Sequence, residues 1–308
     1  MSAFGTTVAR SLKHIGDAVL SGLAIAALKA IRLINPDTVS NIGGWVMRRI
    51  GPLLREHRIG RDNLRAAFPE KSDAELERIL QGVWENLGRV GAEFAHIDKL
   101  WDWDPARPTT GRIMDLGVPF AIARRSIATG KPMLCFAAHL ANWEMPAVVC
   151  HKLGIKSAVL YRRPNLSGVA DAVVDIRKGC MGTLVPAGLS APLKLAEAMQ
   201  DNSQIGLLVD QYYVRGVPVR FFGRTTMANP LLARLARQHE CIIHGIRAIR
   251  HPGNRFEITV TEPIAPVRDA EGQIDVQGTM QAITDVVESW VREHPEQWLW
   301  LHRRWRDE

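Results

Sequence analysis

From about residue 111 onward, short apolar runs alternate with segments that have the periodicity of amphipathic helices. Apolar runs of four to seven residues, bounded by turn residues, are typical of buried strands. Strands separated by single helices predict a mixed, mostly parallel sheet with helices packed on its faces. We therefore expect an α/β core domain over residues 111–308.

The element boundaries follow from residues that end or begin regular structure. The expected strands are residues 132–138, 157–161, 183–186, 205–209, 241–247 and 256–260. The expected helices are residues 115–129, 145–153, 169–180, 191–200, 230–239 and 278–293. Gly130 and Gly154 follow two of these helices, as glycine does at many helix ends.

One predicted strand leads directly into a histidine, His139, and a carboxylate, Glu144, follows five positions later. On one continuous helix these two side chains would point roughly 140° apart. They can meet only if His139 lies in a loop and Glu144 in the first turn of the next helix. Pro146 supports this placement, because proline is tolerated near a helix start. Such a corner lies at the carboxyl ends of the strands, where open α/β sheets bind ligands.

Three further polar clusters follow predicted strands. They are Tyr161 to Asn165, Asp210 to Tyr213 with its continuation to Arg224, and Arg247 to Arg250. Each has an ordinary explanation on its own, because loops are polar and an arginine at a strand end often faces solvent. Together they are consistent with one cleft at the carboxyl edge of the sheet.

The segment before the core is expected to be helical. Residues 12–34 are the most lipid-like stretch, but their uncharged centre is shorter than the ~20 residues that a spanning helix needs. We expect residues 1–35 to form a helix that associates with a membrane, either lying in its interface or as a marginal single span. An ordinary amphipathic helix packed on the protein is the alternative. No small-residue cleavage motif follows, so a signal peptide is not expected.

Residues 36–110 are expected to form a helical N-terminal region. Within it, residues 58–67 predict one helix that ends before Pro69. Ser72 and Glu75 have the spacing of a capping box at the start of a second helix. The two helices predict an amphipathic hairpin that serves as scaffold.

Charge and cysteine content restrict the partners. The net charge of +7 favours an acidic partner, such as nucleic acid, anionic lipid headgroups or an acidic carrier protein. Patterns of nucleic-acid-binding modules are missing from the sequence, so we do not expect a nucleic-acid partner. The four cysteines occur singly and without zinc spacing, so we expect reduced thiols and no metal site.

Several segments of the chain are similar to one enzyme family. HLANWE, residues 139–144, resembles the His-x4-Asp/Glu motif of glycerolipid-type acyltransferases, and most closely its lipid A branch of late acyltransferases. Further similar segments, in the family's order, are NLRAAFP (63–69), YRRPN (161–165), VDQYY (209–213) and PEQWLWLHRRW (295–305). Two departures stand out: Gln211-Tyr212 replaces the His-Asp of some members, and YRRPN has two arginines instead of one.

The resemblance implies transfer of a fatty acyl chain from an acyl-carrier-protein thioester to a hydroxyl of a lipid A precursor, without a cofactor. His139 is the expected general base, because a histidine is mostly neutral yet basic near pH 7. Glu144 is expected to bond its other ring nitrogen and fix the tautomer. Direct attack by the acceptor is favoured, because the chain has no GxSxG motif that would mark a serine nucleophile.

The candidate substrate-binding residues surround this pair in the sequence. Arg162 or Arg163 would stabilise the oxyanion or bind a phosphate of the acceptor, and Asp210 would order an arginine or the acceptor. The remaining candidates are Asn142, Asn165 and Arg177.

The implied partners are acyl carrier protein, an anionic glycolipid acceptor and the membrane surface, and the implied location is the cytoplasmic face of the cell inner membrane. Two alternatives remain open: an acyltransferase for another membrane lipid, such as a lysophospholipid or glycolipid, and a non-catalytic membrane-associated binding protein. Trp298, Trp300 and Trp305 contact lipid headgroups in one interpretation, and in the other Trp298 and Trp300 belong to the core.

Overall fold

The computed structural model describes residues 22, 26, 28–114, 117–162 and 167–306. Most of the expected membrane-associating segment, residues 12–34, lies outside this part of the chain, as do Arg163 and Asn165. Among the described residues, no helix combines the length and the apolar character that crossing a bilayer requires.

The core of the described chain is a seven-stranded sheet with the order β1-β9-β8-β2-β5-β3-β4. Its strands are β1 (Ile113–Met114), β2 (Met133–Ala137), β3 (Ser157–Tyr161), β4 (Thr183–Pro186), β5 (Gln204–Leu208), β8 (Ile242–His251) and β9 (Arg255–Val260). The neighbours from β8 to β4 pair in parallel, whereas β9 runs antiparallel to β8. The expected α/β class with a mixed, mostly parallel sheet is confirmed.

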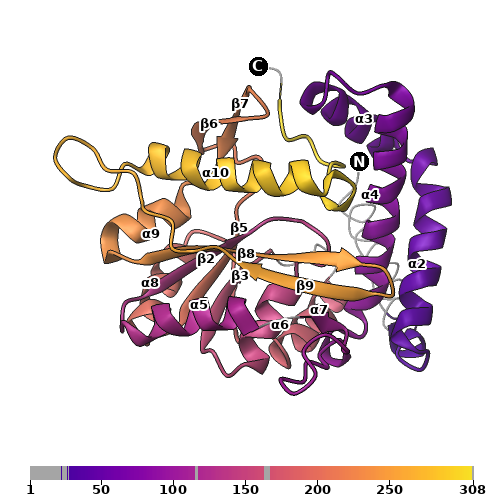
Figure 1. Ribbon diagram of the computed structural model, residues 1–308, viewed down its shortest axis with the longest axis horizontal. Helices are drawn as coiled ribbons and strands as arrows, with labels where there is room; N and C mark the ends of the chain where they lie inside the picture. Colours follow the sequence, from indigo (N-terminus) through magenta and orange to yellow (C-terminus); the bar gives the residue numbers. More distant parts are fainter. Residues whose placement is uncertain (1–21, 23–25, 27, 115–116, 163–166, 307–308) are drawn as a thin grey trace, which may run out of the picture.

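Helices cover both faces of this sheet. In the core they are α5 (Gly117–Ala128), α6 (Met145–Lys152), α7 (Ser167–Lys178), α8 (Ala191–Gln200), α9 (Leu231–His239) and α10 (Val276–Glu293). Figure 1 shows α10 along one face of the sheet and α5 and α6 along the opposite face. Most core boundaries agree with the sequence prediction within three residues, the main exception being β8, which extends to His251.

The side chains on the two faces of β2 belong to two separate apolar cores, because successive side chains along a strand point to opposite faces. Leu134 and Phe136 point to the side of α10, where the Phe136 ring stacks on Trp290 at 5.5 Å between centroids. Met133 and Cys135 point to the other side and pack with residues of α6. Since both faces of the strand are buried, its sequence is apolar without interruption.

The N-terminal region is helical, and it adds one element that the sequence did not suggest. Its helices are α2 (Pro36–Ile50), α3 (Arg55–Ala67) and α4 (Asp73–Phe94), with short 3-10 turns at η1 (Gly51–Leu53) and η2 (Ile97–Lys99). The capping box of Ser72 and Glu75 is present at the start of α4. The unexpected element is α2, which lies beside α4 at one end of the sheet (Figure 1).

A second unexpected element is the hairpin of β6 (Val217–Phe221) and β7 (Arg224–Ala228). Its turn is formed by Phe222 and Gly223, which both have positive φ angles of 51° and 71°. Val217, Val219 and Phe221 alternate as in a strand, but Pro218 between them cannot give a ladder hydrogen bond. In the structure Pro218 lies in an isolated two-stranded ribbon, where every strand is an edge.

Helices α2 and α4 approach closely at two glycines. A Cβ atom on Gly88 would lie 2.2 Å from the carbonyl oxygen of Gly43, and one on Gly43 would lie 2.5 Å from that of Gly88. Real Cβ atoms do not come this close to a backbone oxygen. The pair therefore sets the distance between the two helices.

We expect Gly88→Ala to lower the free energy of unfolding by about 1–3 kcal/mol, because it forces α2 away from α4. Gly91→Ala is the matched control on the same helix, since a Cβ there meets nothing within 4 Å. The control should be neutral or stabilising by up to about 1 kcal/mol, owing to the helix propensity of alanine. Denaturant unfolding measures both, and equal effects of the two substitutions would contradict this packing.

Candidate active site

Strand register brings His139 and Asp210 together. Strands β2 and β5 are parallel neighbours, and Ala137 of β2 pairs with Leu208 of β5. His139 and Asp210 each follow two residues later, so they leave the same edge of the sheet side by side. This is the carboxyl edge, where a ligand site was expected.

Asp210 accepts three hydrogen bonds. The backbone N–H and the Nδ1 atom of His139 each lie 2.8 Å from one of its carboxylate oxygens. The indole Nε1–H of Trp298 donates to the same carboxylate at 2.7 Å. A carboxylate at Nδ1 stabilises the tautomer that carries its proton on Nδ1, which leaves the Nε2 lone pair free to accept a proton.

Nε2 of His139 faces outward, where the side-chain amide of Gln211 lies 3.3 Å away. The indole of Trp143 lies beside the imidazole, with 5.2 Å between ring centroids. The reactive nitrogen is thus accessible, while the rest of the ring is held by protein groups. This is the geometry of a general base.

Glu144 is not the carboxylate that contacts the imidazole. The sequence predicted this contact, but the guanidinium of Arg177 holds Glu144 instead, through two hydrogen bonds, one of them with Nε 3.0 Å from Oε2. Glu144 is the residue immediately before α6, and its carboxylate is directed to α7. The ordering carboxylate comes from the neighbouring strand, because the loop after β2 points the ring toward β5.

The surroundings shift the pKa values of this pair in opposite directions. Burial alone lowers the pKa of the His139 imidazole, but the Asp210 carboxylate, with a smaller contribution from Glu144, raises it above its usual value. Burial opposes ionisation of Asp210, yet the hydrogen bonds and charge of His139 hold the pKa of that carboxyl well below its usual range. Asp210 therefore stays ionised while His139 exchanges a proton.

A second buried carboxylate, Glu93 of α4, supports the loop that carries the histidine. Arg250 of β8 binds both of its oxygens, at 2.5 and 2.8 Å. The side-chain amide of Asn142 donates to Glu93 at 2.8 Å, and its own oxygen accepts the backbone N–H of Glu144. Asn142 is 1% exposed, so its side chain orders the loop from behind.

The same loop is held in a left-handed backbone conformation. Ala141 has φ 48°, a value that costs free energy for any residue with a Cβ. Its N–H donates to the carbonyl of Gln297, and its carbonyl accepts the side-chain amide of Asn86. Leu299 donates from its N–H to the carbonyl of His139 at 3.0 Å. The segment around Trp298 thus fastens both the loop and Asp210.

A cavity of about 400 Å³ opens in front of this pair. It contains the predicted residues His139, Glu144, Arg162 and Arg177 in its wall, together with Gln211 and Tyr212. The cluster from Arg247 to Arg250 lies elsewhere, because Arg250 binds Glu93, and so does the continuation from Val219 to Arg224, which forms the hairpin. One cleft at the carboxyl edge is therefore confirmed for three of the four strand ends that were expected to build it, those of β2, β3 and β5.

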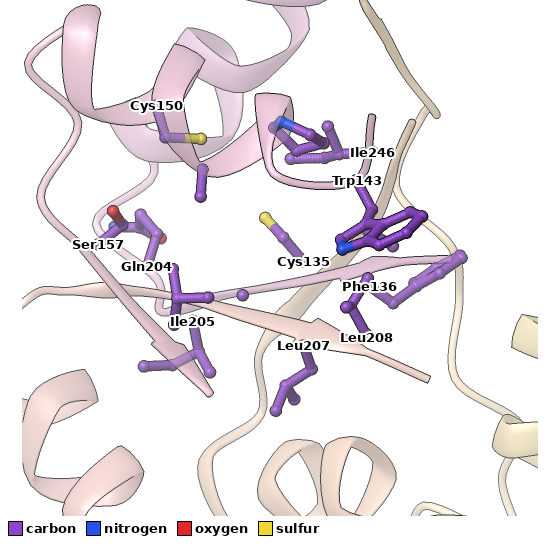
Figure 2. A pocket seen from close by; sticks show the side chains of 15 residues that line it. Cys135, Phe136, Trp143, Cys150, Ser157, Gln204, Ile205, Leu207, Leu208 and Ile246 are labelled. Carbon is purple, nitrogen blue, oxygen red and sulfur yellow. The ribbon is translucent and has the colours of Figure 1, made fainter. Parts of the chain in front are cut away.

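A second, apolar space continues from this cavity beneath α6. Figure 2 shows it between α6 and the sheet, with the sulfur atoms of Cys135 and Cys150 facing it. Four residues line both spaces: Trp143, Ala147, Val159 and Leu208. The second space follows β5 from Leu208 back to Gln204, a distance of roughly 13 Å at 3.3 Å per residue.

Trp298 and Trp300 are 1% and 0% exposed, which confirms the interpretation that they belong to the core. The sequence missed two groups of the site, the indole of Trp298 that holds Asp210 and the carboxylate of Glu93. Glu93 gave no signal because its partners Asn142 and Arg250 are far away in the chain. A carboxylate on the apolar face of an amphipathic helix was the one available hint.

We expect the pKa of the His139 imidazole, measured by NMR titration, to lie above its usual value of about 6.5. Asp210→Asn should lower this pKa, because it removes the larger favourable charge. Glu144→Gln should lower it less, because the carboxylate of Glu144 is the weaker influence. The spectrum of His139→Gln assigns the resonance. An unchanged pKa in Asp210→Asn would show that the carboxylate does not control the imidazole.

Comparison of the sequence with models of known protein families assigns the chain to a family. A sequence model of the bacterial lipid A biosynthesis acyltransferase family matches residues 7–307. The match includes the helical N-terminal region, the whole sheet and every residue of the cavity described above. A comparison with curated proteins found no match. The resemblance of the five segments is thereby confirmed over nearly the full chain, which belongs to the bacterial lipid A biosynthesis acyltransferase family.

Proposed function

We propose that the protein transfers a fatty acyl chain from an acyl-carrier-protein thioester to a hydroxyl of a lipid A precursor, at the cytoplasmic face of the inner membrane. The observation that carries this proposal is His139 at the wall of an open cavity that continues into an apolar space, with its imidazole held from behind by the buried Asp210. Family membership supplies the reaction class. The donor, the acceptor and the location are part of the proposal.

The acceptor hydroxyl replaces Gln211 at Nε2 of His139. Its proton moves to Nε2 as its oxygen attacks the thioester carbonyl, while the Nδ1–H bond to Asp210 stabilises the imidazolium that forms. The tetrahedral intermediate then collapses, the carbon–sulfur bond breaks, and the thiolate takes the proton back from Nε2. His139 ends the reaction neutral, and no bond to the protein forms.

The negative charge of the tetrahedral intermediate needs donors near Nε2. The amide of Gln211 is 3.3 Å from that nitrogen, and Arg162 lies in the wall of the same cavity. We assign the oxyanion to these two side chains. Glu144 then acts as a positioning residue that fixes the guanidinium of Arg177 at the cavity wall. Asp210 takes the part that the sequence assigned to Glu144.

The apolar space beneath α6 is suited to the acyl chain. Burying hydrocarbon there is favourable by about 0.8 kcal/mol for each CH₂ group. Its far end is formed by Ser157 and Gln204, at the opposite end from Trp143 in Figure 2. The carbonyl of a chain that enters past Trp143 would remain in the cavity with His139.

The reaction is tested with purified protein in detergent, a panel of acyl-carrier-protein thioesters and a tetra-acylated lipid A precursor. Mass spectrometry should show the gain of one acyl chain. We expect His139→Ala to lower the rate by about 100- to 10,000-fold, because it removes the general base. His151→Ala on α6, an exposed histidine, is the matched control and should keep full activity.

The pH dependence follows from the raised pKa of His139. Protonated imidazole cannot accept the hydroxyl proton, so kcat/KM should fall as the pH drops, with a midpoint above about 6.5. In Asp210→Asn this midpoint should move to lower pH and the maximum rate should fall. Transfer only to a lysophospholipid or to another glycolipid would overturn the acceptor, and no transfer by folded protein would overturn the reaction.

Chain-length preference tests the apolar space separately. Gly206 of β5 lines this space, and a Cβ there would lie 3.5 Å from Val159, an ordinary contact. A larger side chain at this position should therefore fill the space while the protein still folds. We expect Gly206→Leu to shift the preferred donor to a shorter chain. Gly91→Leu, at an exposed position of α4, is the control. An unchanged preference with a lower overall rate would mean that the chain binds elsewhere.

A further inference from the structure

The outer side of α2 carries large apolar side chains into solvent. Ile42 is 53% exposed and Trp45 is 58% exposed. On the 3-10 turn that follows, Leu53 is 82% exposed, and Leu54 after it is 41% exposed. We call these four residues the apolar ridge. Contiguous exposed apolar surface is uncommon on a soluble protein and marks an interaction site.

The apolar ridge is exposed because of the way α2 packs against α4. Its inner side is committed to α4 through Gly43, Gly44 and Met47. Ile42, Trp45 and Arg49 follow each other at three- and four-residue spacing on the opposite side. The guanidinium of Arg49 lies 4.0 Å above the Trp45 ring. This helix therefore has two apolar sides, and α4 covers only one of them.

A basic groove continues from the end of the ridge. Its lining consists of Arg55, Arg58, Ile59, Asp62, Asn63, Arg224, Arg303 and Trp305. Four cations against one anion leave this lining with three excess positive charges. The side chains of Arg55 and Arg58 are 89% and 90% exposed, and each lies beside a carboxylate, Arg55 beside Glu56 and Arg58 beside Asp62. The buried indole N–H of Trp305 has no hydrogen-bond partner among the described residues.

We propose that the apolar ridge and the basic groove together form a docking face for an anionic lipid bilayer. Ile42, Trp45 and Leu53 enter the interfacial region, and Arg55 and Arg58 bind lipid phosphates beside them. Tryptophan and arginine are the side chains that suit this boundary, because each joins an apolar body to a polar end. The proposal goes beyond the reaction proposed above and assigns membrane contact to residues after the lipid-like segment 12–34.

The charge pattern favours a bilayer over a protein partner. An acidic protein bound in the groove would leave the four aliphatic or aromatic side chains of the ridge in water, whereas a bilayer covers both. An amphipathic element with an apolar face and flanking arginines binds a bilayer by area and charge together. Each arginine near an anionic surface adds to the attraction, which weakens with salt.

The test places an environment-sensitive fluorophore on the ridge of the full chain. Ile42→Cys and Leu53→Cys are labelled, with Leu189→Cys as the matched control, since Leu189 is fully exposed on another part of the molecule. Treating the unsubstituted chain with the same dye measures how much its own four cysteines are labelled. Vesicles of phosphatidylcholine, alone or mixed with phosphatidylglycerol, are then added, and nitroxide-labelled lipid serves as quencher.

We expect a blue shift and lipid quenching at Ile42→Cys and Leu53→Cys with the mixed vesicles, and neither effect at Leu189→Cys. Adding Arg55→Glu and Arg58→Glu together should weaken binding to these vesicles by at least about tenfold. The same pair of substitutions should leave transfer to a detergent-dispersed acceptor unchanged, so failure of the docking face is distinguishable from failure of the proposed reaction.

Three results would overturn the docking face. One is vesicle binding without a shift at either labelled position, which would place the contact elsewhere. Another is a dye that is already blue-shifted without lipid, which would mean that residues 1–27 or a second copy covers the ridge. The third is a shift on addition of acyl carrier protein but not of vesicles, which would identify an acidic protein as the occupant.

Discussion

The ionised carboxylate of Asp210 is the group around which the site is assembled. A buried charge is tolerated only when its oxygens are fully hydrogen-bonded, and Asp210 satisfies this with His139 and Trp298. These donors come from the loop after β2 and from the segment after α10, while the acceptor follows β5. One electrostatic requirement therefore connects three distant parts of the chain, and the orientation of the imidazole follows from it.

Glu93 does the same for the N-terminal helices. Its carboxylate, 0% exposed, is bound by Arg250 of the sheet and by Asn142 of the loop that carries His139. Because removing one partner of a buried ion pair typically costs 3–5 kcal/mol, α4 is not a separable appendage of the core. The helical region that the sequence suggested as scaffold is thus part of the support for the loop that carries His139.

The fold was largely readable from the sequence, and the site only in part. Periodicity located the strands and helices of the core because buried parallel strands are apolar on both faces, as β2 is. His139 was found because it directly follows such a strand. Its partner was not found, since a local motif draws attention to Glu144, whereas register between β2 and β5 decides that Asp210 lies at Nδ1. The spacing of residues in the sequence does not predict how β2 and β5 are aligned. The ridge on α2 was also missed, because exposure depends on which side α4 covers.

The attachment of the loop of His139 by residues 297–299 has a consequence for how the protein is made. The carbonyl of His139 and the carboxylate of Asp210 receive hydrogen bonds from a segment that follows every strand of the sheet and α10 in the chain. A nascent chain on the ribosome can pair β2 with β5 well before that segment exists. The imidazole then acquires its final geometry only after synthesis has passed residue 299, so the order of synthesis makes this site one of the last parts of the fold to form.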